Sequence, residues 1–418
     1  MIRFRGVVFS ILFFASLSSI AQTDTLKISL READRLFVTQ NFYLLASAMN
    51  IEAQKAEIIQ AKLFPNPVAT AEFNAYDPQN EKAFHTNQTG EKSFQIDQLI
   101  LLGGKRRSQI EMAKSNADIA ELELQNLARG LKFQLHTKLV EIGQQQVLLR
   151  KYNSQLALLD TILTAYEEPV RKGNIALKDF VRLKGVYLNL NNDRADLLQQ
   201  YFEAQSNVQT LLQTSSLIYF EFSDNDINSY IKVKSLEELK EVALDNHPEL
   251  LIMRKNRILA DQYLRYQKQL AVPDVNVFVS YDQRGGAFTN QLNTGLAIPL
   301  PVFNRNQGAV KSSAFRMKQA EYTLQALEHE KLSALQNHFA LYSQTVAEYQ
   351  KANRIYNSDF ELTIRGMTDN FQKRNVSLIE FVDFFESYNQ VLAELARIKT
   401  QLVTSAELLN LSIGKDVY

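Results

Sequence analysis

The stretch KGNIALKDF (Lys172–Phe180) decides the fold, because a similar stretch, KRNVSLIEF (Lys373–Phe381), occurs again in the second half of the chain. In both copies a short polar turn follows a long periodic apolar run and leads into another helical pattern. The same order of segments precedes each copy. The sequence therefore predicts two tandem repeats, at 22–215 and 235–418, joined by a connector at 216–234.

Each repeat opens with a helix-start signal. Ser29 and Ser235 each precede a glutamate by three residues. At this spacing the serine side chain and the glutamate side chain satisfy each other's backbone amides, which is typical of a helix N-terminus. We therefore expect one helix over about 29–63, ended by prolines, and another over about 235–270 with a break near Pro248.

Short alternating segments follow these helices. Apolar and polar side chains alternate over 70–76 and over 275–282, with Phe278 as an exception, and return strands are expected at 93–100 and 292–298. About ten residues per strand suits a tilted crossing of a bilayer, and this alternation is typical of outer-membrane barrels. A soluble sheet packed on its own core would give the same alternation.

The number of strands limits the membrane interpretation. Two hairpins supply only four strands per chain, whereas single-chain barrels start at about eight. An open sheet in lipid would also leave unpaired backbone groups at its edges. If these strands lie in a membrane, the chain must oligomerise.

The longest periodic runs predict coiled-coil helices. Apolar and small residues step by three and four over Ile110–Leu131, Leu156–Tyr166 and Val346–Met367. A helix over about 105–168, ended at Pro169, would be on the order of 90 to 100 Å long, far more than one globular domain. The predicted fold is mainly α, with long packed helices and a small β contribution.

Composition excludes several classes of protein. Lys and Arg number 46, as do Asp and Glu, so the chain lacks the basic field that nucleic-acid binding requires. Residues 1–21 read as a secretory signal peptide, with Arg3 and Arg5 before an apolar run and small residues. The exported chain contains no cysteine for a disulfide or a lipid. Beyond the signal it has no apolar run of about 18 residues, so any membrane passage would use strands.

Three junction motifs resemble the TolC family of outer-membrane efflux proteins, over essentially the whole mature chain. They are LFPNP (Leu63–Pro67), LLGGKR (Leu101–Arg106) and IPLPVFNRNQG (Ile298–Gly308), and they look most like the branch that serves cobalt, zinc, cadmium or copper efflux. The resemblance implies a homotrimer in outer-membrane lipid, with four strands per chain joining one twelve-stranded transmembrane β-barrel. It also implies an α-helical coiled-coil tube in the periplasm, a periplasmic adaptor protein and an inner-membrane efflux pump. Some members of the metal branch carry a lipidated cysteine, which this chain lacks.

The same resemblance implies a gate at the periplasmic entrance. Its paired acids match Glu380 and Asp383, which share one helix face and would form stacked acidic rings in a trimer. Such rings favour cations. The first repeat has Asp179 and Arg182 at the equivalent places, so Arg182 could latch onto an acid. Alternatively, the acids form a solvated face or sit favourably near a helix N-terminus.

The turns offer two groups that could contact an adaptor tip. These are Lys172, Gly173 and Asn174 in the first repeat, and Phe371 and Arg374 in the second. Alternatively, these residues simply build the turns.

Patterns for catalysis are lacking. His329-Glu330 has no second histidine at zinc-protease spacing, and Gly103–Lys105 lacks the rest of a phosphate loop. The five histidines show no ligand spacing. We therefore expect no enzyme and no cofactor, but an export duct for metal cations or small toxic compounds. A periplasmic adaptor and a structural coiled-coil protein of the envelope are the alternatives, and the four amphipathic strands argue against both.

Overall fold

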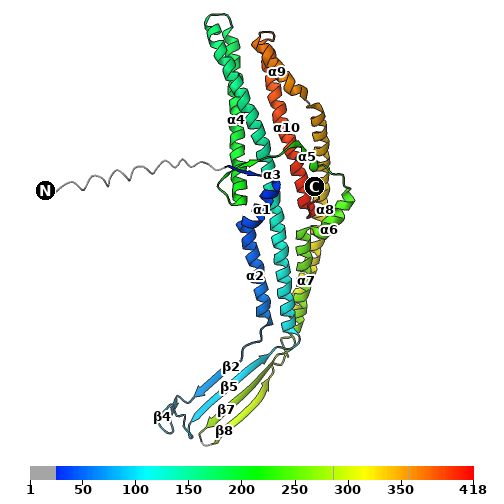
Figure 1. The fold of residues 1–418 in the computed structure, drawn as a ribbon. Coiled ribbons are helices and arrows are strands. Elements are labelled where there is room, and N and C mark those ends of the chain that lie inside the picture. Colours follow the sequence, from blue (N-terminus) through cyan, green and yellow to red (C-terminus); the bar gives the residue numbers. More distant parts are fainter. Residues whose placement is uncertain (1–24, 286, 357) are drawn as a thin grey trace, which may run out of the picture.

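The computed structural model describes residues 25–285, 287–356 and 358–418, and the predicted signal peptide lies outside them. The chain is elongated (Figure 1): long helices run lengthwise, a sheet lies at one end and two helical turns lie at the other. None of the helices in these ranges is both long enough and apolar enough to cross a membrane.

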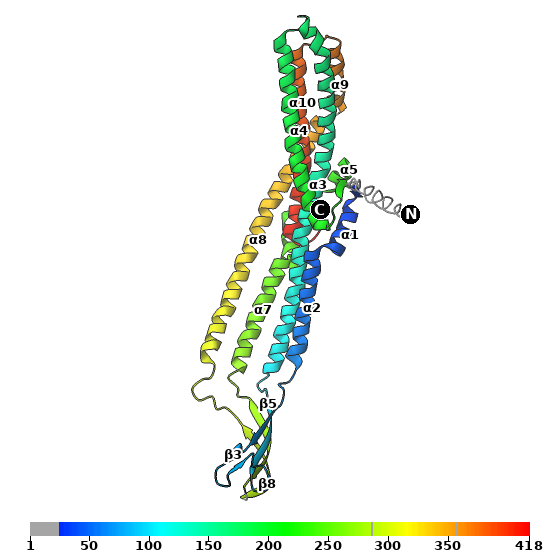
Figure 2. The same ribbon diagram turned by 90° about the vertical axis from the view of Figure 1, so that its left-hand side faces the viewer.

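The helices of the two halves follow the same order, as the repeat prediction requires. The first half contains α1 (Leu30–Gln40), α2 (Phe42–Lys62), α3 (Lys105–Arg171) and α4 (Leu177–Leu212). The second contains α6 (Leu236–Asn246), α7 (Pro248–Gln269), α8 (Gln307–Ile355), α9 (Ser358–Gln372) and α10 (Leu378–Ile413). Figure 2 shows α2, α3, α7 and α8 side by side near the sheet, and α3, α4, α9 and α10 near the turns. The two halves thus form one wall of helices.

The first helix of each half is interrupted at an equivalent residue. Asn41 and His247 have the same extended backbone, with φ −67° and ψ 116°, and each is the N-cap of the next helix. The break predicted near Pro248 is confirmed, whereas the single helix expected over 29–63 is wrong. The side-chain Oδ1 of Asn41 accepts hydrogen bonds from the backbone amides of Tyr43 and Leu44, so a new helix starts there.

The long helices differ between the halves. α3 runs unbroken for 67 residues and includes Pro169 in its last turn, so it extends slightly beyond the predicted end. In the second half the predicted seam over Val346–Met367 is shared by two helices, since α8 ends at Ile355 and α9 begins at Ser358. The second half therefore lacks a single helix as long as α3.

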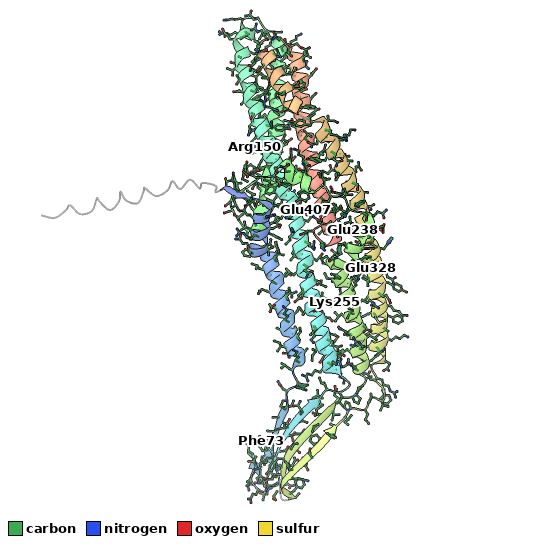
Figure 3. All side chains as sticks on the ribbon, turned by 45° about the vertical axis from the view of Figure 1, so that its right-hand side comes forward. Phe73, Arg150, Glu238, Lys255, Glu328 and Glu407 are labelled. Carbon is green, nitrogen blue, oxygen red and sulfur yellow. The ribbon has the colours of Figure 1, made fainter. Side chains whose placement is uncertain are left out.

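Ion pairs join neighbouring helices along the wall (Figure 3). The Lys255 ammonium on α7 lies 2.7 Å from a carboxylate oxygen of Asp118 on α3. Also on α7, the Arg254 guanidinium lies 3.1 Å from a carboxylate oxygen of Glu328 on α8. These pairs are partly exposed, so each adds only about 0–1 kcal/mol of stability.

The sheet at the end of the molecule has four antiparallel strands in the order β2, β5, β7, β8. They are β2 (Val68–Phe73), β5 (Glu91–Ile100), β7 (Val275–Arg284) and β8 (Phe288–Ala297). The two predicted hairpins are therefore joined through β5 and β7. The loop between β2 and β5 holds the short strands β3 (Tyr76–Asp77) and β4 (Lys82–Ala83).

The register gives the sheet one apolar face and one polar face, as the alternation predicts. Phe94, Tyr281 and Leu292 are aligned across β5, β7 and β8. The Leu292 side chain is 75% exposed. On the opposite face the carboxylate of Asp282 accepts a hydrogen bond from Asn293 over 2.8 Å. No layer of the described residues therefore covers the apolar face.

Phe278, the exception in the alternation, has a local explanation. It lies on the polar face, directly opposite Gly295 of β8. A Cβ atom at Gly295 would come within 2.4 Å of the Phe278 ring. The missing side chain of Gly295 therefore gives the ring its place against the neighbouring strand.

Between the two helical turns and the sheet lies a waist, where the connector at 216–234 packs against the helices. There β1 (Thr25–Ile28), which the sequence did not predict, pairs in parallel with β6 (Leu217–Phe220), and α5 (Asp224–Ser229) follows. Ile218 and Ile227 of the connector are fully buried. One hydrophobic core surrounds this waist, and a second fills the space between the helices nearer the two helical turns.

Candidate gate at the helical tips

The two tips are the turns from α3 to α4 and from α9 to α10, and they are built alike. The amide of Asn174 donates to the carbonyl of Pro169 over 2.8 Å, and Asn375 donates to Asn370 over the same distance. The sequence match between the repeats thus corresponds to one turn geometry used twice.

One position in each turn has a left-handed backbone. Gly173 has φ +76°, and Arg374 takes the equivalent place with φ +64°. A side chain in this region costs about 1–2 kcal/mol, so Arg374 keeps a strained position that glycine fills freely. Lys172, Gly173, Asn174 and Arg374 are all exposed. They remain available to a partner.

Phe371, which was predicted to contact an adaptor, is instead part of the core. It is only 3% exposed. Its ring stacks on Phe381 at 4.3 Å and on Tyr166 at 5.8 Å between centroids. The prediction for Phe371 is therefore wrong, because an aromatic ring at this turn is drawn inward to hold α3, α9 and α10 together.

Glu380 has a structural task at the start of α10. Its carboxylate accepts hydrogen bonds from the Ser377 hydroxyl at 2.7 Å and the Ser377 amide at 2.9 Å. The Ser377 hydroxyl accepts from the Glu380 amide in turn, which completes a capping box. These bonds hold the pKa of Glu380 below its ordinary value. The carboxylate is exposed and ionised at neutral pH, and one of its oxygens is already hydrogen-bonded to Ser377.

Arg182 and Asp383 meet across the gap between α4 and α10. The guanidinium Nη2 of Arg182 lies 3.4 Å from Oδ1 of Asp383, and both side chains are well exposed. Asp179 lies in the first turn of α4, where a negative charge favours the helix dipole. The structure thus brings together Arg182 and Asp383, one residue from each repeat, while Glu380 and Asp179 serve helix starts.

A buried charged cluster at the waist was not found from the sequence. On α3, His136 lies 2.7 Å from Asp34 of α1 through Nε2 and 2.7 Å from Glu407 of α10 through Nδ1. Burial alone would lower the pKa of His136, but hydrogen bonds to the two carboxylates raise it to about 9. The partners are 102 and 271 residues away in the sequence, so no spacing rule could have found them.

Metal-ligating groups are dispersed. Over 25–285, 287–356 and 358–418 there is no group of three or more His, Asp or Glu side chains that could hold a metal ion.

Comparison with known proteins finds relatives by sequence and by structure. No known family model matches the chain. The cobalt-zinc-cadmium resistance protein CzcC of Cupriavidus metallidurans is 24% identical over 296 residues, which cover 70% of this chain and 68% of CzcC.

Solved structures share the fold over nearly the whole chain. CusC, studied for transmembrane channel formation, superposes with a TM-score of 0.76 at 14% identity, covering 92% of both chains. The outer membrane protein VceC of Vibrio cholerae gives 0.72 at 14% identity, covering 93% of this chain and 97% of its own. The outer membrane channel CmeC of Campylobacter jejuni gives 0.73 at 12% identity, with 93% and 87% covered. The predicted fold class is confirmed.

Proposed function

We propose that this chain, which has the fold of the TolC family of outer-membrane efflux proteins, is the outer-membrane duct of a tripartite efflux system. One observation carries the proposal: a four-stranded sheet at the end of the helical wall with an exposed apolar face. In water such a face is unfavourable, whereas in lipid it is the expected outer surface of a barrel. A periplasmic adaptor or a structural coiled coil would not need this sheet.

The sheet also supports a homotrimer. β2 and β8 each pair on one side only, and the unpaired backbone groups of an open edge do not persist in lipid. If β8 of one copy pairs with β2 of the next, three copies close a barrel of twelve strands, four from each copy. The helical walls of the three copies would then continue the barrel as a tube across the periplasm.

The tips are the proposed closed end of the duct. In a trimer the Arg182–Asp383 pair occurs three times, and each pair holds α4 against α10. Opening then requires these exposed and therefore weak pairs to separate. Glu380 and Asp179 add negative charge beside them. Such a ring favours the passage of cations.

An adaptor would dock on the exposed residues of the two turns, namely Lys172, Gly173, Asn174 and Arg374. An inner-membrane pump would drive the transport, since the duct itself has no energy source. The name of CzcC associates that protein with resistance to cobalt, zinc and cadmium. We include metal cations among the cargo on this basis, alongside small toxic compounds.

Single-channel conductance in planar bilayers tests the duct. We compare wild type with Asp383→Asn and Arg182→Gln, and with Glu52→Gln, which neutralises an exposed acid on α2, as the control. The wild type should show a small cation-selective conductance. Arg182→Gln should open more often with selectivity kept, whereas Asp383→Asn should open more often with weaker selectivity.

The duct proposal fails if the purified wild type gives no conductance and stays in solution without detergent. That result would favour the adaptor alternative. If the wild type conducts but Arg182→Gln and Asp383→Asn behave like Glu52→Gln, the duct stands and the gate assignment falls.

A further inference from the structure

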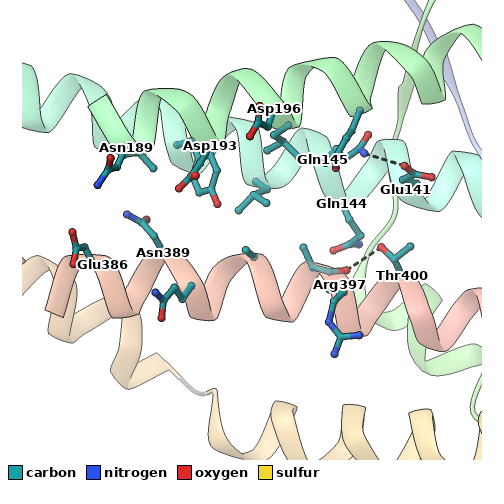
Figure 4. Close-up of a pocket in the computed structure, with 18 of the residues that line it drawn as sticks. Glu141, Gln144, Gln145, Asn189, Asp193, Asp196, Glu386, Asn389, Arg397 and Thr400 are labelled. Atoms are coloured by element: carbon teal, nitrogen blue, oxygen red, sulfur yellow. Dashed lines mark hydrogen bonds between the residues drawn. The ribbon is translucent and has the colours of Figure 1, made fainter. Parts of the chain in front are cut away.

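A long groove lies between α4 and α10, with α3 along one side, at a distance from the tips. It encloses about 970 Å³, which is at the upper end for sites that hold a small molecule. Figure 4 shows the labelled polar side chains of α4 and α10 facing each other across it. None of the groups in the proposed gate lines this groove.

The groove has an apolar floor and a polar rim. Leu148 and Tyr152 of α3 line it together with Leu190 and Leu197 of α4, and all four are buried. Polar side chains from all three helices stand above this floor. A ligand that fits this division has an apolar body and a polar group.

The rim is strongly acidic. Asp193 and Asp196 of α4 and Glu386 of α10 line the groove, and none of them forms an ion pair within the described part of the chain. Positive charge among the described lining residues comes from Arg397, whose guanidinium is already held by Glu394 at 2.6 and 2.8 Å. The net field in the groove therefore attracts cations.

Two buried amide oxygens in the same groove lack hydrogen-bond partners. Oδ1 of Asn389 and Oε1 of Gln145 are inaccessible and accept no hydrogen bond, in side chains only 8% and 7% exposed. In Figure 4 the Asn389 side chain rises from α10 toward α4, between Glu386 and the floor. A buried acceptor without a partner is costly, so a bound donor would be favoured once either amide turns its oxygen into the groove.

We infer that this groove binds amphipathic organic ammonium ions. Ionised carboxylates and amide oxygens accept hydrogen bonds and donate none. They therefore suit a ligand with N–H donors and a positive charge. These carboxylates are spread along two facing helices instead of converging on one point, which suits an extended ligand better than a bare ion. The inference rests on the proposed function, because the groove would be a cargo site within the duct.

Fluorescence titration of the detergent-purified protein with dansylcadaverine tests the site. Dansylglycine has the same fluorophore with a negative charge and is the probe control. We compare wild type with the double variant Asp193→Asn, Asp196→Asn, with Asn389→Leu, and with Glu203→Gln, an exposed acid of α4 outside the groove. All keep the helical wall, which circular dichroism checks.

The wild type should bind dansylcadaverine saturably and dansylglycine much more weakly. The double variant should bind dansylcadaverine about tenfold more weakly, since charged hydrogen-bond partners are lost, and Asn389→Leu several-fold more weakly. Glu203→Gln should bind as wild type does. Equal binding of both probes, no saturable binding, or an unchanged Kd in the double variant would overturn the inference. Wild-type conductance is a separate result, so a duct that conducts without binding the amine leaves the proposed function standing.

Discussion

The buried charge of His136 makes the stability of this protein depend on pH in a defined direction. Both ring nitrogens contact carboxylates at 2.7 Å, so both carry protons and the ring is an imidazolium. The pKa of about 9 lies above the ordinary 6.5. This difference corresponds to about 3 kcal/mol of stability. Because the folded-state pKa is raised, the contribution is complete below pH 6.5 and is lost as the pH rises through 9.

We propose to measure this with His136→Gln. In urea unfolding of the detergent-purified protein, followed by circular dichroism, wild type should exceed His136→Gln by about 3 kcal/mol at pH 6. The gap should narrow steadily and nearly close by about pH 10. The control is His338→Gln. His338 contacts the Ser412 hydroxyl, and burial lowers its pKa, so His338 is neutral throughout the alkaline range.

The shape of the pH dependence decides the outcome. His338→Gln should follow the wild-type curve above pH 7, shifted by a constant. A gap between wild type and His136→Gln that stays the same from pH 6 to pH 10 would refute the reasoning. Any effect of His136 on stability would then come from packing, because an effect of its positive charge must vanish once the ring is deprotonated.

Three substitutions and one matched control test the sheet and the tips. Leu292→Arg places a charge on the apolar face and should lower stability in bilayers by about 2 to 4 kcal/mol. The control Asn293→Arg, on the opposite face, should lower stability less. Equal shifts in the urea midpoint of the two variants would contradict the assignment of faces. Gly295→Val should displace the Phe278 ring and cost about 1–3 kcal/mol, and an unchanged melting temperature would count against that packing. Arg374→Gly removes a left-handed side chain and should raise stability by about 1 kcal/mol; a lower melting temperature would show that the arginine makes a stabilising contact.

Local signals in the sequence were sufficient for most of the fold. The serine helix starts, the strand alternation and the repeated turn each depend on neighbours within a few residues, and the structure has each of them at its expected place. Ser29 and Glu32 form the full reciprocal pair, whereas Ser235 accepts from the Glu238 amide without the return bond. The errors arose where a local signal was ambiguous. Asn41 was expected inside a helix but is a cap, and its Nδ2 donates to the Leu211 carbonyl, 170 residues away, a contact that the local sequence does not indicate.

The candidate sites depended more on packing. A turn residue such as Phe371 can face a partner or the core, and the rings of Tyr166 and Phe381 beside it draw it inward. Glu380 and Asp383 share a helix face, yet one closes a capping box and the other meets Arg182 of the other repeat. The role of Glu380 follows from its local spacing to Ser377, whereas the contact of Asp383 with Arg182 depends on the arrangement of α4 against α10.

The sequence by itself determined the repeated order of helices and strands, the amphipathic sheet and the repeated turns at the tips, because these follow from the period of the side chains and from contacts within one turn. Only the tertiary structure decided which charges meet. His136 finds Asp34 and Glu407, and Arg182 finds Asp383, from distant parts of the chain. The acidic groove likewise exists only because three helices converge on it. The physical reason is that the pairing of side chains depends on distance in space, which spacing along the chain does not fix.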